Sequence, residues 1–223
     1  MNNSNSWFNL HQPMLENQIY HIFNQGNNGE VIFKNKENKN YFKSKLYKYI
    51  SPFADVLAEC LMSDHYHLLI RIKPYKEVAE HVHKVKGLYQ VIKRHKAIGK
   101  RNEISIIISE MLRRCFMSYA KAFNKMYNRL GSLFRKNFRR KLITSEKYLK
   151  NIWIYIHKNP QKHKYIEDYR KSKSSSYSNY LHSNIKNLYI KMIFNKIFIN
   201  IDLYIKNHEQ YIQSNDDDIV IIE

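Results

Sequence analysis

The sequence predicts a protein of mixed strands and helices, and three stretches support this prediction. Residues 65–73 alternate between apolar and polar side chains, and this period of two is typical of a half-buried strand. A second strand is predicted at 56–62, and only Ser63 and Asp64 separate the two, which favours a hairpin. Residues 106–130 instead place an apolar residue at every third or fourth position, as a helix packed on a core does.

Size and composition allow a globular protein with a polyanionic partner. The 223 residues suffice for one large domain or two small ones, and 43% of them are hydrophobic, which is enough for a real core. Lys and Arg exceed Asp and Glu by 38 − 19 = 19 charges, which indicates nucleic acid or an anionic membrane as partner. Part of the lysine excess reflects an AT-rich coding bias, because Asn, Ile, Tyr and Phe are also abundant throughout. The arginine clusters are less easily explained in that way.

Cysteine usage and hydropathy bear on the location of the protein. Cys60 and Cys115 lie in unrelated contexts, so neither a disulfide framework nor a zinc knuckle is indicated, and a reducing, intracellular location fits. The N-terminus has no apolar run of the signal-peptide type. No stretch approaches the ~18 apolar residues of a membrane helix. We therefore expect a cytoplasmic protein without a membrane partner.

Turn residues and a proline divide the first half of the chain into short elements. Residues 18–23 are predicted to form a strand, which the Asn- and Gly-rich stretch 24–29 ends. Residues 38–50 have helical spacing, and Pro52 stops that helix. Residues 77–96 are predicted to form one polar, basic helix.

Two histidines and two cations lie on the polar side of the strand at 65–73. His65 and His67 are two residues apart and point the same way, and imidazole nitrogen is the commonest neutral metal ligand, so the pair can grip one ion. Two ligands do not make a site, and the alternative is a polar strand face that contains two histidines by chance. Arg71 and Lys73 follow on the same side and suit a ligand that carries phosphate.

Further cations gather on the helix at 106–130 and on the stretch behind it. On the helix they lie off the apolar stripe, where charges most often form only a solvated face, and Gly131 ends the helix. Residues 131–143 alternate again and predict a strand with one arginine-rich face, which suits bidentate phosphate contact. The alternative is a basic edge strand kept soluble by its charge. The candidate nucleic-acid contacts are Arg71, Lys73, Arg114, Lys121, Lys125, Arg129, Arg135, Arg139, Arg140 and Lys141.

A helix is predicted from Ser145, a plausible N-cap, to Asn159, the residue before Pro160. Tyr155 and Asn159 are an i, i+4 pair at the margin of its apolar stripe, so their tips can meet. A side chain at the margin of the stripe can be held in place by packing and still reach a cleft. The alternative for this tyrosine is an ordinary boundary residue, since the chain has 18 tyrosines.

The C-terminal part of the chain is less informative. Residues 160–180 form a polar connection, and residues 184–213 are predicted to form one or two helices. An acidic tail begins at Asp216. The chain shows neither an internal repeat nor a convincing second domain.

Taken together, the motifs resemble one known family. They are the segments 20–28, 60–69, 119–134 and 155–160, followed by Ser175-Ser176-Tyr177. In this order and spacing they resemble the REP-associated tyrosine transposases, members of the HUH group of single-stranded DNA transposases, over roughly residues 17–180.

This sequence departs from the family pattern in three places. Ser63-Asp64 stands where the family usually has Pro-Asn, and Gln25 where an arginine is common. The segment between Asp168 and Ser175 is longer than usual and lacks the customary tryptophan. These departures concern the recognition of DNA more than its cleavage.

The resemblance implies an α+β fold in which helices cover an antiparallel sheet of ferredoxin-like arrangement. Residues 1–180 would form the catalytic domain, and residues 181–223 a helical extension with the acidic tail. By the same resemblance, His65, His67 and Asn159 would bind a divalent metal, and Tyr155 would be the nucleophile. Two imidazoles and an amide oxygen suit Mg²⁺ or Mn²⁺.

The implied activity is metal-dependent cleavage and rejoining of single-stranded, hairpin-forming DNA through a 5′-phosphotyrosine intermediate. The expected partner is single-stranded or hairpin DNA, a homodimer is allowed, and the expected location is the nucleoid within the cytoplasm. The alternative function is that of a non-catalytic protein, descended from such a transposase, that recognises hairpin or repeat DNA.

Overall fold

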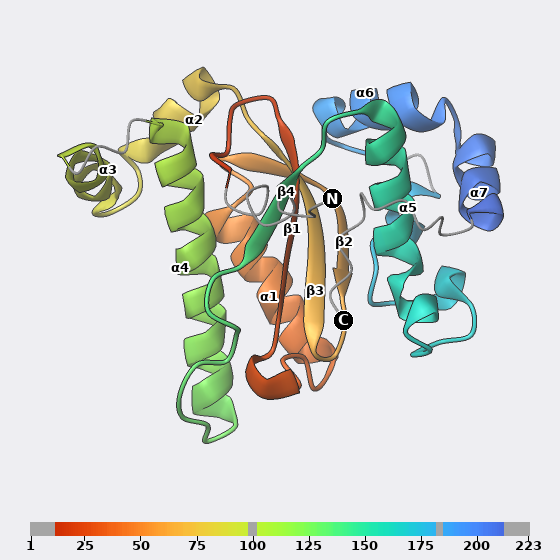
Figure 1. Cartoon of the computed structure of the whole chain (residues 1–223), viewed down its shortest axis with the longest axis horizontal. Helices are drawn as coiled ribbons and strands as arrows, with labels where there is room; N and C mark the ends of the chain where they lie inside the picture. Colours follow the sequence, from red (N-terminus) through yellow and green to blue (C-terminus); the bar gives the residue numbers. More distant parts are fainter. Residues whose placement is uncertain (1–11, 98–101, 182–184, 212–223) are drawn as a thin grey trace, which may run out of the picture.

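The computed structural model describes residues 12–97, 102–181 and 185–211. Within these ranges, short 3₁₀ helices at Asn27–Gly29, Tyr169–Lys171 and Tyr177–Tyr180 accompany the regular elements. The strands and α-helices are β1 (Ile19–Gln25), α1 (Lys36–Tyr49), β2 (Ala54–Leu61), β3 (His65–Ile72), α2 (Tyr75–Val82), α3 (Leu88–Ala97), α4 (Glu103–Met126), β4 (Arg139–Leu142), α5 (Glu146–Lys162), α6 (Leu188–Phe198) and α7 (Ile201–Gln210) (Figure 1).

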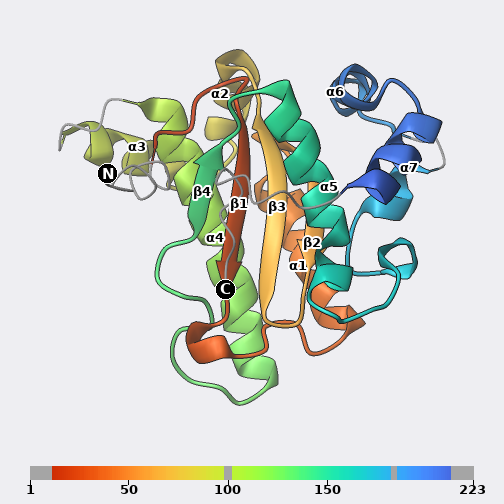
Figure 2. The ribbon, with the colours of Figure 1, turned by 45° about the vertical axis from the view of Figure 1, so that its right-hand side comes forward.

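The four strands form one antiparallel sheet in the order β2-β3-β1-β4. The hairpin β2–β3 places its second strand next to β1, and β4 pairs on the other side of β1, as in a ferredoxin-like sheet. Helices α1 and α4 lie on one face of the sheet, whereas α5, with α6 and α7 behind it, lies on the other (Figures 1 and 2). The α+β fold expected from the resemblance is confirmed.

Strand β3 is buried along its whole length, so the prediction of a half-buried strand is wrong. Its alternation is nevertheless real, because Tyr66, Leu68, Ile70 and Ile72 join the core beneath α1 and α4. Leu69 joins the core beneath α5. The second face is covered because α5 packs across it, and this covering helix encloses the polar side chains of β3.

Two predicted helices differ in extent from those observed. The stretch 77–96 is not one helix but two, α2 and α3, and Gly87 between them has a φ of 73° that a right-handed helix cannot contain. Helix α4 begins three residues before the predicted start, where the side chain of Asn102 accepts a hydrogen bond from the backbone N–H of Ser105. It ends at Met126 rather than at residue 130.

The strand predicted over 131–143 is confined to Arg139–Leu142. Positive φ angles at Gly131 (84°) and Asn137 (65°) turn the chain and prevent a continuous extended segment. Phe134 still makes an isolated antiparallel bridge to Gly26. The basic stretch is therefore a loop that runs along the end of β1 before it becomes an edge strand.

Helix α5 begins where predicted but extends beyond Asn159. The hydroxyl of Ser145 caps it by accepting a hydrogen bond from the N–H of Tyr148 at 3.1 Å. Pro160 lies inside its last turn, where it removes one backbone donor without ending the helix, so the end predicted at residue 159 is wrong. The extra turn carries Lys162 and leads to His163.

Helices α6 and α7 pack on the side of α5 that faces away from the sheet. Phe194 and Phe198 pack against the ring of Trp153, with ring centroids 6.4 and 5.6 Å from it, and Tyr204 packs against both phenylalanines. The expected acidic tail lies outside the described residues. Among the residues that the structure describes, no helix is long and apolar enough to cross a membrane.

Candidate active site

The two histidines of β3 lie at the beginning of the strand, on the face toward α5. His65 pairs in register with Gln25 of β1, and His67 pairs with Phe23. Their ring centroids are 5.2 Å apart and the rings are nearly perpendicular. Both side chains are buried. The alternation of a strand therefore brings the two imidazoles together under one helix, as their spacing predicts.

Helix α5 brings the other two candidate residues to the same place. The Oδ1 atom of Asn159 lies 3.1 Å from Nε2 of His65. The ring of Tyr155 meets the ring of His67 edge-on, with centroids 5.5 Å apart. Tyr155 is only 2% exposed and Asn159 is fully buried. The four residues that the resemblance implies as metal ligands and nucleophile thus converge within one chain.

Asp64, treated in the sequence only as a turn residue, holds His65 in place. Its Oδ1 lies 2.9 Å from Nδ1 of His65, and the hydroxyl of Tyr165 donates to the same oxygen at 3.2 Å. Burial alone would raise the pKa of Asp64, but the charge and hydrogen bond of His65 and the bond from Tyr165 outweigh it, so this pKa is lowered. An ionised carboxylate only accepts, so Nδ1 of His65 carries a proton and Nε2 faces Asn159.

The donor atoms at this point fit a cation. In its neutral form, with the proton on Nδ1, His65 presents a lone pair at Nε2 to the carbonyl oxygen of Asn159, so that two electron-pair donors face each other. A positive ion between them satisfies both. Within the described ranges no three His, Cys, Asp or Glu side chains are grouped to hold a metal ion. A metal here would depend on two imidazoles and one amide from the protein.

A third histidine, His21 of β1, joins the site. Its Nε2 lies 2.9 Å from Nδ1 of His67, and it is 1% exposed. Burial first, and then the charge of Lys141, lowers the pKa of His21 to about 3, so this ring is neutral. His21 belongs to the sequence motif 20–28, but no role was predicted for it. What could have indicated a role is its position on β1, the strand that pairs with β3.

Two residues beyond Asn159 were also missed, because the helix was expected to end there. The ring centroid of His163 lies 4.9 Å from that of His65. The ammonium of Lys162 lies 5.2 Å from the ring centroid of Tyr155. Burial, followed by the nearby His21, His65, His163 and Lys162, holds the pKa of His67 well below its usual range. His67 is therefore a neutral imidazole, the form that binds metals.

Cations of β4 and its preceding loop border this site. Lys141 pairs in register with His21, and Arg139 with Phe23, so both share the face that carries the histidines. Arg135 is exposed, and its guanidinium lies 2.6 Å from the side-chain oxygen of Gln25 when that amide is oriented to accept. The predicted alternation of Arg139 and Lys141 against Leu142 agrees with this register. These cations are next to the histidines in space.

Arg140 points to the opposite face of β4, where a large groove lies. Its guanidinium donates to the carbonyl of Gln12 at 2.7 Å and to the hydroxyl of Ser109 at 3.3 Å. The groove has a volume of about 760 Å³ and lies between α4 and the loop before β4. Its walls combine phenylalanine rings with cations, among them Phe116, Phe138, Arg113 and Lys121.

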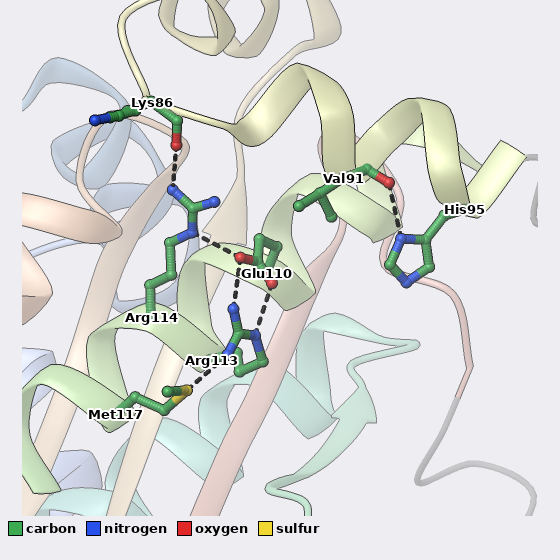
Figure 3. Close-up of polar contacts among 7 residues, drawn as sticks. All are labelled: Lys86, Val91, His95, Glu110, Arg113, Arg114 and Met117. Carbon is green, nitrogen blue, oxygen red and sulfur yellow. Dashed lines mark hydrogen bonds and ion pairs between the residues drawn. The ribbon is translucent and has the colours of Figure 1, made fainter.

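Besides Arg135 and Arg140, four more of the candidate nucleic-acid contacts bind other parts of the protein. Arg71 is buried in an ion pair with Asp55 at 2.9 Å, and Lys73 donates to the carbonyl of Ser51. Arg129 forms an ion pair with Glu30. Arg114 lies 2.6 Å from Glu110, the carboxylate that it shares with Arg113, and also donates to the carbonyl of Lys86 (Figure 3). Lys121 and Lys125 are exposed on α4.

An antiparallel sheet of this order, with a histidine pair on β3 beneath a helix that carries a tyrosine and an amide, is the arrangement that the resemblance of the sequence implies. Residues 14–103 match the family model described as "Transposase IS200 like". No curated protein matches the chain. The match confirms the family resemblance and supports a transposase or DNA-binding function.

A solved structure described as "Structure of the REP associates tyrosine transposase bound to a REP hairpin" has the same fold. Its TM-score to this chain is 0.50 at 12% sequence identity, and the alignment covers 79% of this chain and 86% of the other. At this identity the similarity establishes the fold, and the chemistry of the site has to be argued from its own residues.

Proposed function

We propose that this protein is a metal-dependent HUH tyrosine transposase that cleaves and rejoins single-stranded, hairpin-forming DNA. The observation that carries the proposal is the convergence of His65, His67, Asn159 and Tyr155 in one buried cluster built by β3 and α5. Nothing in the packing of an ordinary strand and helix requires two imidazoles, an amide and a phenol to meet.

His65, His67 and Asn159 would hold the metal. A divalent ion such as Mg²⁺ or Mn²⁺ supplies, when bound, Lewis-acid polarisation of the scissile phosphate. The lone pair that His65 turns toward the amide oxygen of Asn159 supports this assignment, as does the neutral state of His67. With three protein ligands, the site leaves positions for the oxygens of a phosphate.

Tyr155 would attack the phosphorus atom. Its phenolic oxygen forms a bond to phosphorus as the bond between phosphorus and the 3′ oxygen breaks. The phenolic proton is lost to solvent, and the departing 3′ oxygen takes up a proton from solvent. The products are a 5′-phosphotyrosine and a free 3′-hydroxyl, and the reverse reaction rejoins strands because the ester conserves the bond energy. Lys162 lies over the tyrosine ring, where its positive charge stabilises a developing phenolate. Because Tyr155 is almost wholly buried, its ring has to turn outward to meet DNA.

The DNA would reach the site along β4. The structurally similar transposase is bound to a REP hairpin, and hairpin DNA is the partner that we propose for this chain. Arg135, Arg139 and Lys141 border the histidines on one face, and cations in such a row neutralise successive phosphates. The groove between α4 and the loop before β4 could hold unpaired bases against its phenylalanine rings.

Burial of Tyr155 also favours a second function, that of a non-catalytic DNA-binding protein. The two functions are distinguished by incubating the protein with a labelled single-stranded hairpin oligonucleotide and Mg²⁺ or Mn²⁺. A transposase yields a covalent protein–DNA band on a denaturing gel, and a binding protein yields none.

Tyr155→Phe removes only the hydroxyl, so it should eliminate the covalent band and leave hairpin affinity unchanged. Tyr148→Phe is the matched control, because Tyr148 is a buried tyrosine seven residues earlier on the same helix. Tyr148 has Ile152 one turn on, which cannot bind a metal, and its variant should keep the band. A band that survives Tyr155→Phe would assign the attack to another tyrosine.

A further inference from the structure

His21 lies directly behind His67, on the neighbouring strand. In the antiparallel register of β1 and β3, His21 is opposite Leu69 and Phe23 is opposite His67, so His21 and His67 are diagonal neighbours on the face beneath α5. Their rings are nearly parallel, with centroids 5.1 Å apart. The ring of Tyr155 lies 6.4 Å from that of His21. Backbone pairing alone therefore fixes the position of His21 behind the candidate ligand.

The contact between the two rings has two possible proton arrangements. The 2.9 Å separation of Nε2 of His21 and Nδ1 of His67 requires one nitrogen to donate and the other to accept. If His67 donates, its Nε2 has no proton and can bind a metal. If His21 donates, the proton of His67 is on Nε2, and that nitrogen cannot be a ligand.

His65, the other candidate ligand on β3, is also contacted at Nδ1, and there the position of the proton is not ambiguous. The carboxylate of Asp64 contacts Nδ1 of His65 at 2.9 Å and can only accept. Nδ1 of His65 is thereby protonated, and its Nε2 faces the site. Both histidines are thus contacted at Nδ1 by a residue from outside the ligand set, and metal-binding histidines are commonly oriented in this way.

We propose that His21 is the positioning residue of His67. It accepts the Nδ1 proton of His67 through Nε2, which keeps Nε2 of His67 unprotonated and turned toward the metal position. Its own proton then lies on Nδ1, a buried atom that has no hydrogen-bond partner among the described residues. This role rests on the metal centre proposed above and adds a residue that is neither a ligand nor a nucleophile.

The test compares the Mn²⁺ affinity of the full chain in the absence of DNA, measured by calorimetry, across a set of variants. His21→Leu removes the acceptor and should weaken Mn²⁺ binding by about 10- to 100-fold, the usual effect of losing a residue that orients a ligand. His21→Gln keeps an oxygen that can accept and should restore affinity to within a few-fold. Phe23→Leu is the packing control, because Phe23 is a buried neighbour of both rings without a polar atom. It should bind Mn²⁺ as the wild type does.

A second measurement uses the wild type and does not depend on any variant folding. Imidazole ¹⁵N chemical shifts in the Mg²⁺-loaded protein should show that His67 carries a proton on Nδ1 and none on Nε2, and that His21 carries its proton on Nδ1. Wild-type affinity in His21→Leu, or a proton on Nε2 of His67, would overturn the role of His21 while leaving the metal centre in place. A wild type that binds no Mn²⁺ would overturn the metal centre itself, and the role of His21 with it.

Discussion

Helix α5 has a buried pair of histidines on each side, and the two pairs are built differently. On the sheet side, His21 and His67 meet at 2.9 Å beneath Tyr155. On the far side, His157 of α5 meets His208 of α7 at 3.1 Å. His157 is two residues from Tyr155, which is about 200° around a helix, so the two pairs lie on opposite sides of α5.

The pair on the far side is fully hydrogen-bonded. His157 Nε2 contacts the hydroxyl of Ser176 at 3.0 Å, and its Nδ1 also lies 3.1 Å from the hydroxyl of Tyr204. His208 Nδ1 contacts the carbonyl of Tyr204 at 2.8 Å. Lys158 adds hydrogen bonds to the carbonyls of His208 and Tyr211. Every ring nitrogen has a partner, so the group ties α7 to α5 and has no capacity left for a ligand.

On the sheet side, by contrast, not every buried polar atom has a hydrogen-bond partner among the described residues. Nδ1 of His21 and Nδ2 of Asn159 are buried, and neither has a hydrogen-bond partner in the part of the chain that the structure describes. Unpartnered buried polar atoms destabilise a fold by about 1–3 kcal/mol each, so they persist where they serve another purpose. Nε1 of Trp153 on the far side is also buried without a partner among the described residues, so the contrast concerns the histidines themselves. It indicates that the far histidines tie α7 to α5, whereas those on the sheet side keep a capacity to bind.

Alanine substitutions on the two sides should separate these roles, and this is the largest effect expected. His65→Ala and His67→Ala should abolish cleavage but leave hairpin binding nearly intact, because these side chains serve the metal and not the DNA backbone. Gel-shift titrations measure binding, and the covalent band measures cleavage. A parallel loss of both activities would contradict the assignment of these histidines to the metal.

His157→Ala should have the converse effect. It removes one buried hydrogen-bond partner from each of Ser176, Tyr204 and His208, so the free energy of unfolding should fall by about 3 kcal/mol in urea titrations. Cleavage per folded molecule should be retained, since His157 faces away from the site. If His157→Ala lost cleavage without losing stability, the division of roles across α5 would be wrong.

The sequence predicted which residues converge at the candidate site better than it predicted their surroundings. The spacing of His65 and His67 on a strand, and of Tyr155 and Asn159 on a helix, follows from two backbone periods that local sequence encodes. His21 and Asp64 were not predicted as site residues. The role of His21 depends on its diagonal pairing with His67 across two strands, and that of Asp64 on a side-chain contact made within the turn before β3. The pair of His157 and His208 was not predicted for a similar reason, since its two residues are 51 positions apart in the sequence and meet only in the folded chain.

Element boundaries were predicted less well wherever single residues decided them. Gly87 splits the helix expected at 77–96, and Asn137 bends the strand expected at 131–143. Pro160, expected to end α5, lies in its last turn, and this is why Lys162 and His163 were not anticipated near the site. In each case the deciding factor is a local φ angle or a tertiary contact that periodicity does not report.

Acid should weaken the fold through the far pair, an effect intermediate in size. Burial lowers the pKa of His157 well below its usual range and that of His208 to about 3. In the unfolded chain both rings take up protons below about pH 6.5, so their contribution to stability is complete above that pH and declines as the pH falls. For each ring the free energy of unfolding should decrease by about 1.4 kcal/mol per pH unit until the folded state is also protonated.

Replacing one ring tests this pH dependence. His208→Gln removes one titrating group, so between pH 6 and 4.5 its stability should depend less steeply on pH than that of the wild type, by about 1.4 kcal/mol per unit. Urea unfolding at several pH values measures the slope. Identical slopes in the two proteins would mean that His208 is already charged in the folded state.

The smallest effect expected concerns the side of α5 along which we propose that DNA approaches. Arg135→Ala and Arg139→Ala should each weaken hairpin binding and reduce the slope of log K against log salt by roughly 0.7, the value for one phosphate contact to a single strand. Lys206→Ala is the matched control, because Lys206 is an exposed cation of α7, on the far side of α5 from the sheet. Its removal lowers the net charge equally but should leave the salt slope unchanged. Equal shifts in all three variants would show that the protein attracts DNA only through its overall charge of +19, and that β4 makes no specific phosphate contact.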